Sequence, residues 1–281
     1  MPALGITDLP WPLDKFRVDL HDSAFETDDD AAAEDAKRAK LLRKQAAQHG
    51  GDWGFRCGRL ADRLDPAFNP EFPASPASSR YMRDPRIRIP GQLWRLFDED
   101  RTGQVVRYDV VKPGLIRDLE GLLDESPKRA TNELRSDILR GAQGPHNGFL
   151  FASYHNEFDN LSQLFQGHFH LLVSGDYVDL VERMRKLKGY RPTEIVRTPI
   201  LAHRTITNPA HALTYLVKSY WSQRPFLPLG ANGTAKRPRN GQRLDEPYHS
   251  EVLLWLDRWT LADLTLLLGM RVNKHGLVLT S

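Results

Sequence analysis

His168 and His170 are the residues of this chain whose types and spacing most clearly suggest chemistry. They flank Phe169 inside the apolar run 164–173, which predicts a strand. Because successive residues of a strand face opposite sides, both imidazoles would lie on one face while Phe169 and Leu171 lie on the other. Neutral imidazoles bind divalent metals. The pair therefore suggests a metal site, with two half-exposed histidines on a solvated sheet face as the alternative.

A tyrosine and a lysine three residues apart form the second group. Asn208 and Pro209 predict the start of a helix that runs to about residue 221, since asparagine caps helices and proline suits their first turn. At about 100° per residue, Tyr215 and Lys218 share a polar face of that helix. That face also carries His211, Ser219 and Ser222, and the apolar face, predicted to enter the core, carries Leu213, Leu216, Val217 and Tyr220. A tyrosine and a lysine are also common on ordinary helix surfaces.

In this order the two groups resemble the second and third motifs of the HUH endonucleases, and most of all the Rep proteins that initiate rolling-circle replication. The matching segments are 167–173 and 215–218, and the resemblance covers about residues 103–222. Residues 104–111 stand in the place of the first motif and match it poorly. Relaxases usually put the tyrosine before the histidines, and single-strand transposases usually carry a glutamine after it, so both are less similar.

The resemblance implies site-specific, metal-dependent nicking and joining of single-stranded DNA. Tyr215 would attack a phosphodiester and stay linked to the 5′ phosphate, releasing a 3′ hydroxyl that primes rolling-circle replication of a plasmid, phage or related mobile element. Mg²⁺ or Mn²⁺ would polarise the phosphate. Lys218 would contact phosphate or stabilise the phenolate. Ser219 stands where some members carry a second tyrosine, which implies a mechanism with one tyrosine.

His168 and His170 would be two of the metal ligands, and the third is expected to be an oxygen. Glu157 is our choice, because the predicted strand 149–158 could lie antiparallel beside the His pair. His155 and Asp159 are the reserves. An ordinary solvated carboxylate at a strand end is the alternative interpretation of Glu157.

The pattern of elements predicts an α+β fold, with helices packed on a central antiparallel sheet in an HUH-like, ferredoxin-like arrangement. Residues 1–102 are predicted to form a helical and proline-rich extension, in which the prolines between 65 and 90 suggest an extended arm. Residues 103–225 would form the catalytic domain, and 226–281 a basic loop with a C-terminal helix at about 247–268. Further strands are expected at 104–111 and 193–206, and further helices at 31–48, 114–123, 128–140 and 176–188.

Basic residues outside the two motifs are candidates for contacts with DNA, since the net charge is +3 and phosphate binding is largely ionic. Solvated loop charge is the alternative for each group. The first group is Lys236, Arg237, Arg239 and Arg243, and the second is Arg80, Arg83, Arg86 and Arg88. Single-stranded or origin DNA is the expected partner. The spacing of a nucleotide-binding loop is missing from the sequence, so a separate helicase would unwind the duplex.

Composition narrows the class of protein further. Of 281 residues, 40% are hydrophobic and 27% charged, as in globular domains. The single cysteine excludes an intramolecular disulfide and a cysteine-rich zinc site. Neither a membrane span nor a signal peptide is predicted, so a cytoplasmic protein is expected. A non-catalytic DNA-binding regulator on the same fold, a nuclease that uses water, and a single-strand DNA transposase remain open as alternatives.

Overall fold

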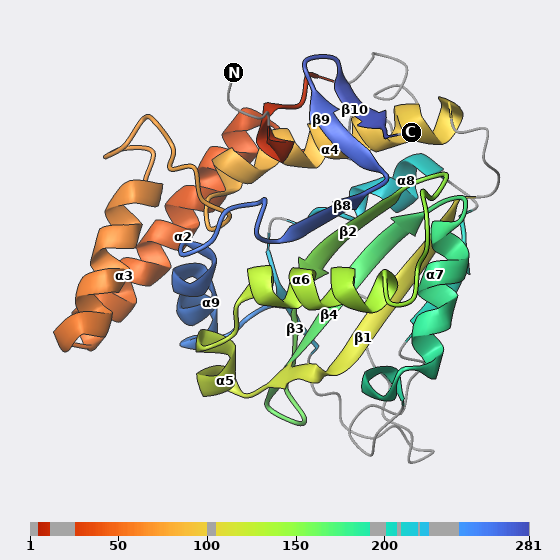
Figure 1. The fold of residues 1–281 in the computed structure, drawn as a ribbon. Coiled ribbons are helices and arrows are strands. Elements are labelled where there is room, and N and C mark those ends of the chain that lie inside the picture. Colours follow the sequence, from red (N-terminus) through yellow and green to blue (C-terminus); the bar gives the residue numbers. More distant parts are fainter. Residues whose placement is uncertain are drawn as a thin grey trace, which may run out of the picture.

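The computed structural model describes residues 5–11, 26–99, 105–191, 201–206, 209–218, 220–224 and 242–280. In these residues eight strands form one sheet (Figure 1). Six of them follow the order β5-β1-β4-β3-β6-β7. The other two lie off this path: β2 also pairs with β4, next to β3, and β8 pairs with the other side of β2. The strands are β1 (Val106–Arg117), β2 (Leu150–His155), β3 (Glu157–Asp159), β4 (Leu164–Val173), β5 (Leu201–Thr205), β6 (Ser222–Arg224), β7 (Gln242–Arg243) and β8 (Thr265–Leu268). All pairings are antiparallel except that of β3 with β6. The predicted α+β class is confirmed at this level.

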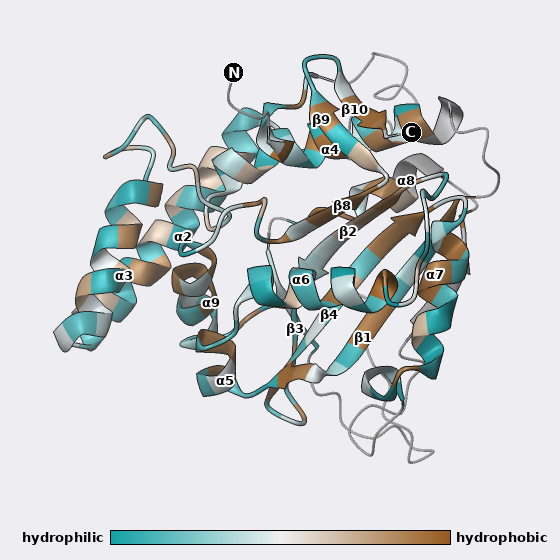
Figure 2. Cartoon of the chain, viewed as in Figure 1, coloured by the Kyte–Doolittle hydropathy of each residue, from teal (hydrophilic) through white to brown (hydrophobic). Residues whose placement is uncertain are grey.

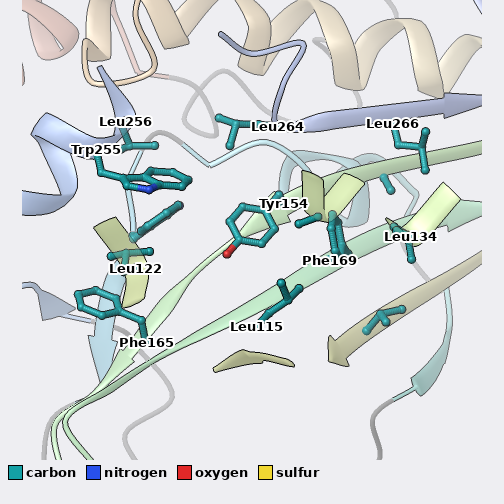
Figure 3. Packing of buried hydrophobic residues seen from close by; sticks show 14 of the residues in the cluster. Leu115, Leu122, Leu134, Tyr154, Phe165, Phe169, Trp255, Leu256, Leu264 and Leu266 are labelled. Atoms are coloured by element: carbon teal, nitrogen blue, oxygen red, sulfur yellow. The ribbon is translucent and has the colours of Figure 1, made fainter. Parts of the chain in front are cut away.

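The central strand β4 separates the two faces of the sheet as its alternation predicts. Phe169, Leu171 and Val173 are buried in the larger hydrophobic core, where Figure 3 shows Phe169 beside Tyr154. Gly167 is required by close packing, because a Cβ there would lie 2.6 Å from the Tyr154 hydroxyl. The strand therefore carries Phe169, Leu171 and Val173 on one face, and its two histidines and Leu172 on the other.

Helices cover both faces. On the face of Phe169, the core is completed by α5 (Leu119–Leu123), α6 (Pro127–Ile138), α7 (Tyr177–Arg183) and α9 (Tyr248–Leu256). The opposite face is covered by α4 (Ser79–Glu99) and α8 (Pro209–Thr214), which pack against one another. The second core joins these helices to the sheet through Met82, Ile89, Leu93, Phe149, Phe151, Leu172, Leu213, Leu216 and Val217. Figure 2 shows the apolar residues gathered along the sheet strands.

The N-terminal residues are part of the same packed body. Helices α2 (Asp28–Gln48) and α3 (Gly51–Leu64) pack side by side, and Thr27 begins α2 with a capping box. The predicted extended arm is wrong over 79–90, because those residues belong to the helix α4, which contains Pro85 and Pro90. Burial of its apolar residues against the second core offsets the weak helix propensity of the prolines.

The C-terminal residues enter the sheet. The helix predicted at about 247–268 is wrong beyond Leu256, since residues 265–268 form β8 and pair with β2. The error has a physical reason, because an apolar run packed on several sides carries no clear period. A hairpin of β9 (Met270–Asn273) and β10 (Gly276–Leu279) then packs against α4. Packing is thus continuous across the boundaries predicted at 102 and 225.

Smaller elements complete the description. A 3-10 turn, η1 (Ile6–Asp8), packs on α4, and two others follow α7, η3 (Met184–Lys186) and η4 (Lys188–Tyr190). The helix predicted at 114–123 is wrong in its first part, since β1 continues to Arg117 before α5 begins. Residues 193–200 of a predicted strand lie outside the described residues. In the described part of the chain, no helix has both the length and the apolar character needed to cross a membrane.

Candidate histidine and tyrosine site

Three histidines meet on the face of the sheet opposite the larger core. His168 and His170 come from β4, and His155 lies at the end of β2, directly opposite His168 in the strand pairing. The ring centroids of His155 and His170 are 4.8 Å apart, those of His168 and His170 are 4.9 Å apart, and those of His155 and His168 are 6.0 Å apart. The antiparallel register of β2 and β4 therefore builds a compact imidazole cluster.

Each imidazole has one nitrogen committed to an acceptor. His170 Nδ1 donates to Asp109 Oδ1 at 2.7 Å, His168 Nδ1 donates to the Gln166 carbonyl at 2.9 Å, and His155 Nε2 donates to the Leu216 carbonyl at 3.0 Å. A neutral imidazole has one N–H, so the lone pairs remain on His170 Nε2, His168 Nε2 and His155 Nδ1. Fixing one nitrogen this way orients the other toward a ligand.

Burial keeps this cluster uncharged. It lowers the pKa of His155 well below its ordinary value, and it lowers the pKa of His168 to about 3. Burial also lowers the pKa of His170, although the hydrogen bond to Asp109 opposes that effect. At neutral pH all three rings are therefore in the form that can bind a metal.

Asp109 and Arg107 extend the site onto β1. Asp109 pairs with His170 in the register of β1 and β4. Burial disfavours the charged carboxylate, yet the hydrogen bond from His170 and the charge of Arg107 hold the Asp109 pKa well below its usual range. Neither residue was predicted from the sequence to have a role. Their alternation with the buried Tyr108 was the available signal, because it places two charged residues on one face of a strand.

The fit of these residues to a divalent metal is partial. Within the described residues, no group of three or more His, Cys, Asp or Glu side chains is arranged to hold a metal ion. His170 Nε2, however, is buried and has no hydrogen-bond partner in the described part of the chain, which is costly unless a ligand takes its place. The residues fit a metal held by the Nε2 atoms of His168 and His170, with its other positions taken by oxygen from solvent or substrate.

Tyr215 lies beside this cluster, but not on a helix. The helix predicted to run to about residue 221 is wrong beyond Thr214, where α8 ends. The physical reason is tertiary, since the carbonyl of Leu216 accepts hydrogen bonds from Ser153 and His155 instead of continuing a helical ladder. The Tyr215 ring centroid lies 6.5 Å from that of His170. Contacts with β2 therefore place the tyrosine.

Two cations flank the Tyr215 ring. Lys218 Nζ and the Arg107 Cζ each lie 5.2 Å from the ring centroid. Tyr215 itself is 45% exposed, so a large substrate can reach it. Burial lowers the pKa of Lys218, while the charge of Glu157 opposes that effect. The predicted neighbourhood of Tyr215 and Lys218 is present, although a turn rather than a helix face provides it.

Other residues predicted for this helix are placed differently. Leu213, Leu216 and Val217 are buried as predicted, but the prediction for Tyr220 is wrong, because its side chain is 50% exposed. Trp221 is buried in its stead and packs on Trp255 with 4.9 Å between ring centroids. The early end of α8 changes the face on which each later residue lies. Ser219 and the side chain of His211 lie outside the described residues.

Glu157, the expected third ligand, has another partner. Strand β2 ends at His155, and after Asn156 the chain continues as β3, which carries Glu157 and pairs with β6. There the Glu157 carboxylate forms an ion pair with Arg224. Asp159, a reserve ligand, accepts a hydrogen bond from the backbone of Leu161. The reserve His155 is the residue that lies beside the histidine pair, and a metal-binding role for Glu157 stays a prediction.

The residues predicted to contact DNA fall into two groups. Lys236, Arg237 and Arg239 lie outside the described residues. Arg243 is described, and its guanidinium binds both carboxylate oxygens of Glu34 at 2.7 and 2.6 Å. The basic residues of α4 are also paired, for example Arg86 with Glu26 and Arg88 with Asp84. These contacts tie the arginines to the fold.

Comparisons with protein-family models, with curated proteins and with solved structures find no match to this chain. The case for a function therefore rests on the geometry of the site and on the motifs in the sequence.

Proposed function

We propose that this chain nicks and joins single-stranded DNA at a specific site, using Tyr215 as the nucleophile in a metal-dependent transesterification. The observation that carries the proposal is the position of the Tyr215 ring beside His170, with two cations flanking the phenol. A phenol is a weak nucleophile at neutral pH. Cations that stabilise negative charge on the phenol and on the phosphate would provide the activation it needs.

The charges of the site suit a phosphodiester. The cations Arg107, Lys218 and Arg224 outnumber the carboxylates Asp109 and Glu157, and the three histidines are neutral. The exposed position of Tyr215 suits an extended strand better than a small enclosed substrate. This balance favours an anionic polymer as the substrate.

Each residue of the site would have its own role in the proposed reaction. Lys218 would bind the phosphate or stabilise the phenolate of Tyr215. Asp109 would hold the His170 ring so that Nε2 faces the ligand. Ser153 and His155 would fix the Leu216 carbonyl and with it the position of Tyr215. A Mg²⁺ or Mn²⁺ ion held by His168 and His170 supplies, when bound, Lewis-acid polarisation of the phosphate.

The biological role follows from the same resemblance. A covalent bond between Tyr215 and the 5′ phosphate leaves a free 3′ hydroxyl, which can prime synthesis. We therefore propose an HUH-type fold and a role in starting rolling-circle replication of a plasmid, phage or related mobile element. A separate helicase would unwind the duplex, and the cytoplasm is the proposed location.

The test is covalent capture. The purified chain is incubated with Mn²⁺ and a pool of single-stranded oligonucleotides, and a protein–DNA band that survives denaturation is expected. Tyr215→Phe and His168→Ala should abolish the band. Tyr220→Phe is the matched control, because Tyr220 is a similarly exposed phenol five residues away, and it should retain the band. Sequencing the attached strand identifies the cleavage site.

Other outcomes select other functions. Cleavage with no adduct would indicate a nuclease that uses water. A band that depends on Tyr220 and survives Tyr215→Phe would overturn the assignment of the nucleophile. A band formed only with oligonucleotides that carry the end of a mobile element, at the point where the element is excised, would favour a single-strand transposase.

A non-catalytic DNA-binding regulator is the second candidate. It is favoured by the absence, among the described residues, of a ready group of three metal-binding side chains. This candidate predicts binding of an oligonucleotide with neither cleavage nor a response to Mn²⁺. A gel-shift assay on the same pool, with and without EDTA, separates it from the enzyme.

A further inference from the structure

Arg107 is a residue of the site to which neither the motifs nor the family resemblance assigns a role. It lies on β1 two residues before Asp109, so the two side chains share the face that carries the histidines. Arg107 Nη2 and Nε donate to Asp109 Oδ1 at 2.9 and 3.2 Å. The same carboxylate oxygen accepts the hydrogen bond from His170. One oxygen thus joins Arg107 to the histidine pair.

Arg107 also contacts the proposed nucleophile. Its Cζ lies 5.2 Å from the centroid of the Tyr215 ring, as close as the Lys218 ammonium. A guanidinium is planar, permanently charged and fixed by its fork of donors, whereas an ammonium is a point charge on a flexible stem. The bond to Asp109 holds this fork still beside the phenol.

The guanidinium has donor capacity to spare. Two of its nitrogens are committed to Asp109, and Nη1 makes no hydrogen bond to any residue that the structure describes. The side chain is largely buried but not sealed, with 16% of its surface exposed. An arginine held by a carboxylate, with one amino group left over and its guanidinium next to the ring of the proposed nucleophile, is suited to bind a phosphate oxygen.

We propose that Arg107 is a catalytic residue of the strand-transfer reaction, binding a non-bridging oxygen of the scissile phosphate through Nη1 while its charge stabilises the Tyr215 phenolate. This inference rests on the proposed function and deepens it. In the step itself, the bond between Tyr215 Oη and phosphorus forms as the bond between phosphorus and O3′ breaks. The phenolic proton is lost and the departing 3′ oxygen gains a proton, so neither charge nor redox state changes overall.

The experiment measures adduct formation in a single turnover at saturating oligonucleotide and Mn²⁺. Arg107→Ala should slow the reaction about 100-fold, the cost typical of losing one donor to a developing oxyanion. The dissociation constant for the oligonucleotide should change much less than the rate. Arg107→Lys should recover part of the loss, because it restores the charge without the fork. Arg117→Ala is the matched control, an arginine of the same strand that pairs with Glu125, and it should react at the wild-type rate.

Chemical rescue separates a catalytic role from a structural one. Ethylguanidinium added to Arg107→Ala should restore a saturable fraction of the rate, while sodium chloride at equal ionic strength should not. A merely structural arginine gives no such rescue. If Arg107→Ala does not fold, judged by its thermal transition, Arg107→Gln and Arg107→Lys carry the comparison.

Failures of the two proposals are distinguishable. A wild-type rate in Arg107→Ala, with wild-type adduct present, overturns the role of Arg107 and leaves the proposed function standing. A slow variant that guanidinium does not rescue and that binds DNA proportionally more weakly also overturns it, since the residue then acts in binding alone. No adduct from the wild-type chain overturns both proposals together.

Discussion

Two clusters in this molecule place a neutral histidine among arginines and carboxylates, and they differ in what is left unpaired. In the site, His170 meets Asp109 and Arg107, and its Nε2 atom has no partner among the described residues. Between α2 and α9, the ring of His249 lies with Arg243, and Nε2 accepts a hydrogen bond from Arg243 Nη1 at 3.3 Å. Glu34 then binds Arg243 and the fully buried Arg38.

The difference teaches that a depressed pKa alone does not identify a reactive histidine. Burial, followed by the charge of Arg243, lowers the pKa of His249 to about 3, much as burial lowers the pKa of His168. The cluster of Glu34, Arg38, Arg243 and His249, called the Glu34 cluster below, uses its polar atoms to join distant parts of the chain. The histidine site keeps lone pairs available, which is the property that a ligand requires.

The largest effect is expected from a substitution that disrupts the Glu34 cluster. Glu34→Ala removes the carboxylate that compensates Arg38 and Arg243, and should lower the free energy of unfolding by about 3 kcal/mol, because a buried charge is left uncompensated. Urea unfolding measures the change. Glu133→Ala is the control, since the Glu133 side chain in its ion pair with Lys112 is 48% exposed, and the pair should contribute less than about 1 kcal/mol. Equal losses in the two variants would remove the distinction.

The second-largest effect is expected from a metal ion, which should bind at the histidine site and not at the Glu34 cluster. Mn²⁺ at a hundred times its dissociation constant should raise the free energy of unfolding by about 2.7 kcal/mol through binding to the folded state. His168→Ala or His170→Ala should abolish this gain. His249→Ala should be less stable at the start and should still gain from Mn²⁺. Chemical unfolding with Mn²⁺ and with EDTA provides the comparison, and a gain lost in His249→Ala would contradict it.

A substitution of Asp109 tests whether the hydrogen bond that orients His170 supports metal binding at the histidine site. Asp109→Asn keeps the size of the side chain but removes the carboxylate that orients His170. We expect the affinity for Mn²⁺ to fall about 10-fold to 100-fold, as for other residues that support a metal ligand. Isothermal calorimetry gives the affinity. Asp137→Asn, which alters a carboxylate bound to Lys112, should leave the affinity unchanged.

The effect of acid is the smallest of these when it is taken per pH unit. The pKa of His249 is lower in the folded chain than in the unfolded chain, so the unfolded chain takes up the proton first. The stability from this residue is complete above about pH 6.5 and is lost as the pH falls toward 3. The loss should be about 1.4 kcal/mol per pH unit in this window. His249→Gln should show a shallower decline on the acid side in urea titrations, whereas the exposed His275→Gln should follow the wild type.

The alternation of β4 could be predicted from sequence because it is local. Residues 169, 171 and 173 are aliphatic or aromatic while 168 and 170 are imidazoles, and the structure places them on opposite faces. The end of α8 could not be predicted this way. Its cause is a pair of hydrogen bonds from Ser153 and His155 to Leu216, about sixty residues away in the chain.

The choice between Glu157 and His155 shows the same limit. The two residues are two positions apart in one predicted strand, so the alternation of that strand predicts the same face for both. The strand breaks at Asn156, after which β3 pairs with β6 and Glu157 meets Arg224. Only the pairing of distant segments distinguishes the two. Arg107 and Asp109, by contrast, were within reach of the sequence, since their charge and spacing on a predicted strand were visible.

Strand β8 has a consequence for the time at which the site is made during synthesis. Its residues 265–268 pair with β2, the strand that ends in His155. While this part of the chain is still on the ribosome, one edge of β2 has no neighbour and presents unpaired backbone groups. The histidines and the tyrosine are all synthesised before that edge is covered. The site is therefore completed by a strand that carries none of its reactive groups, and only after the motifs themselves have left the ribosome.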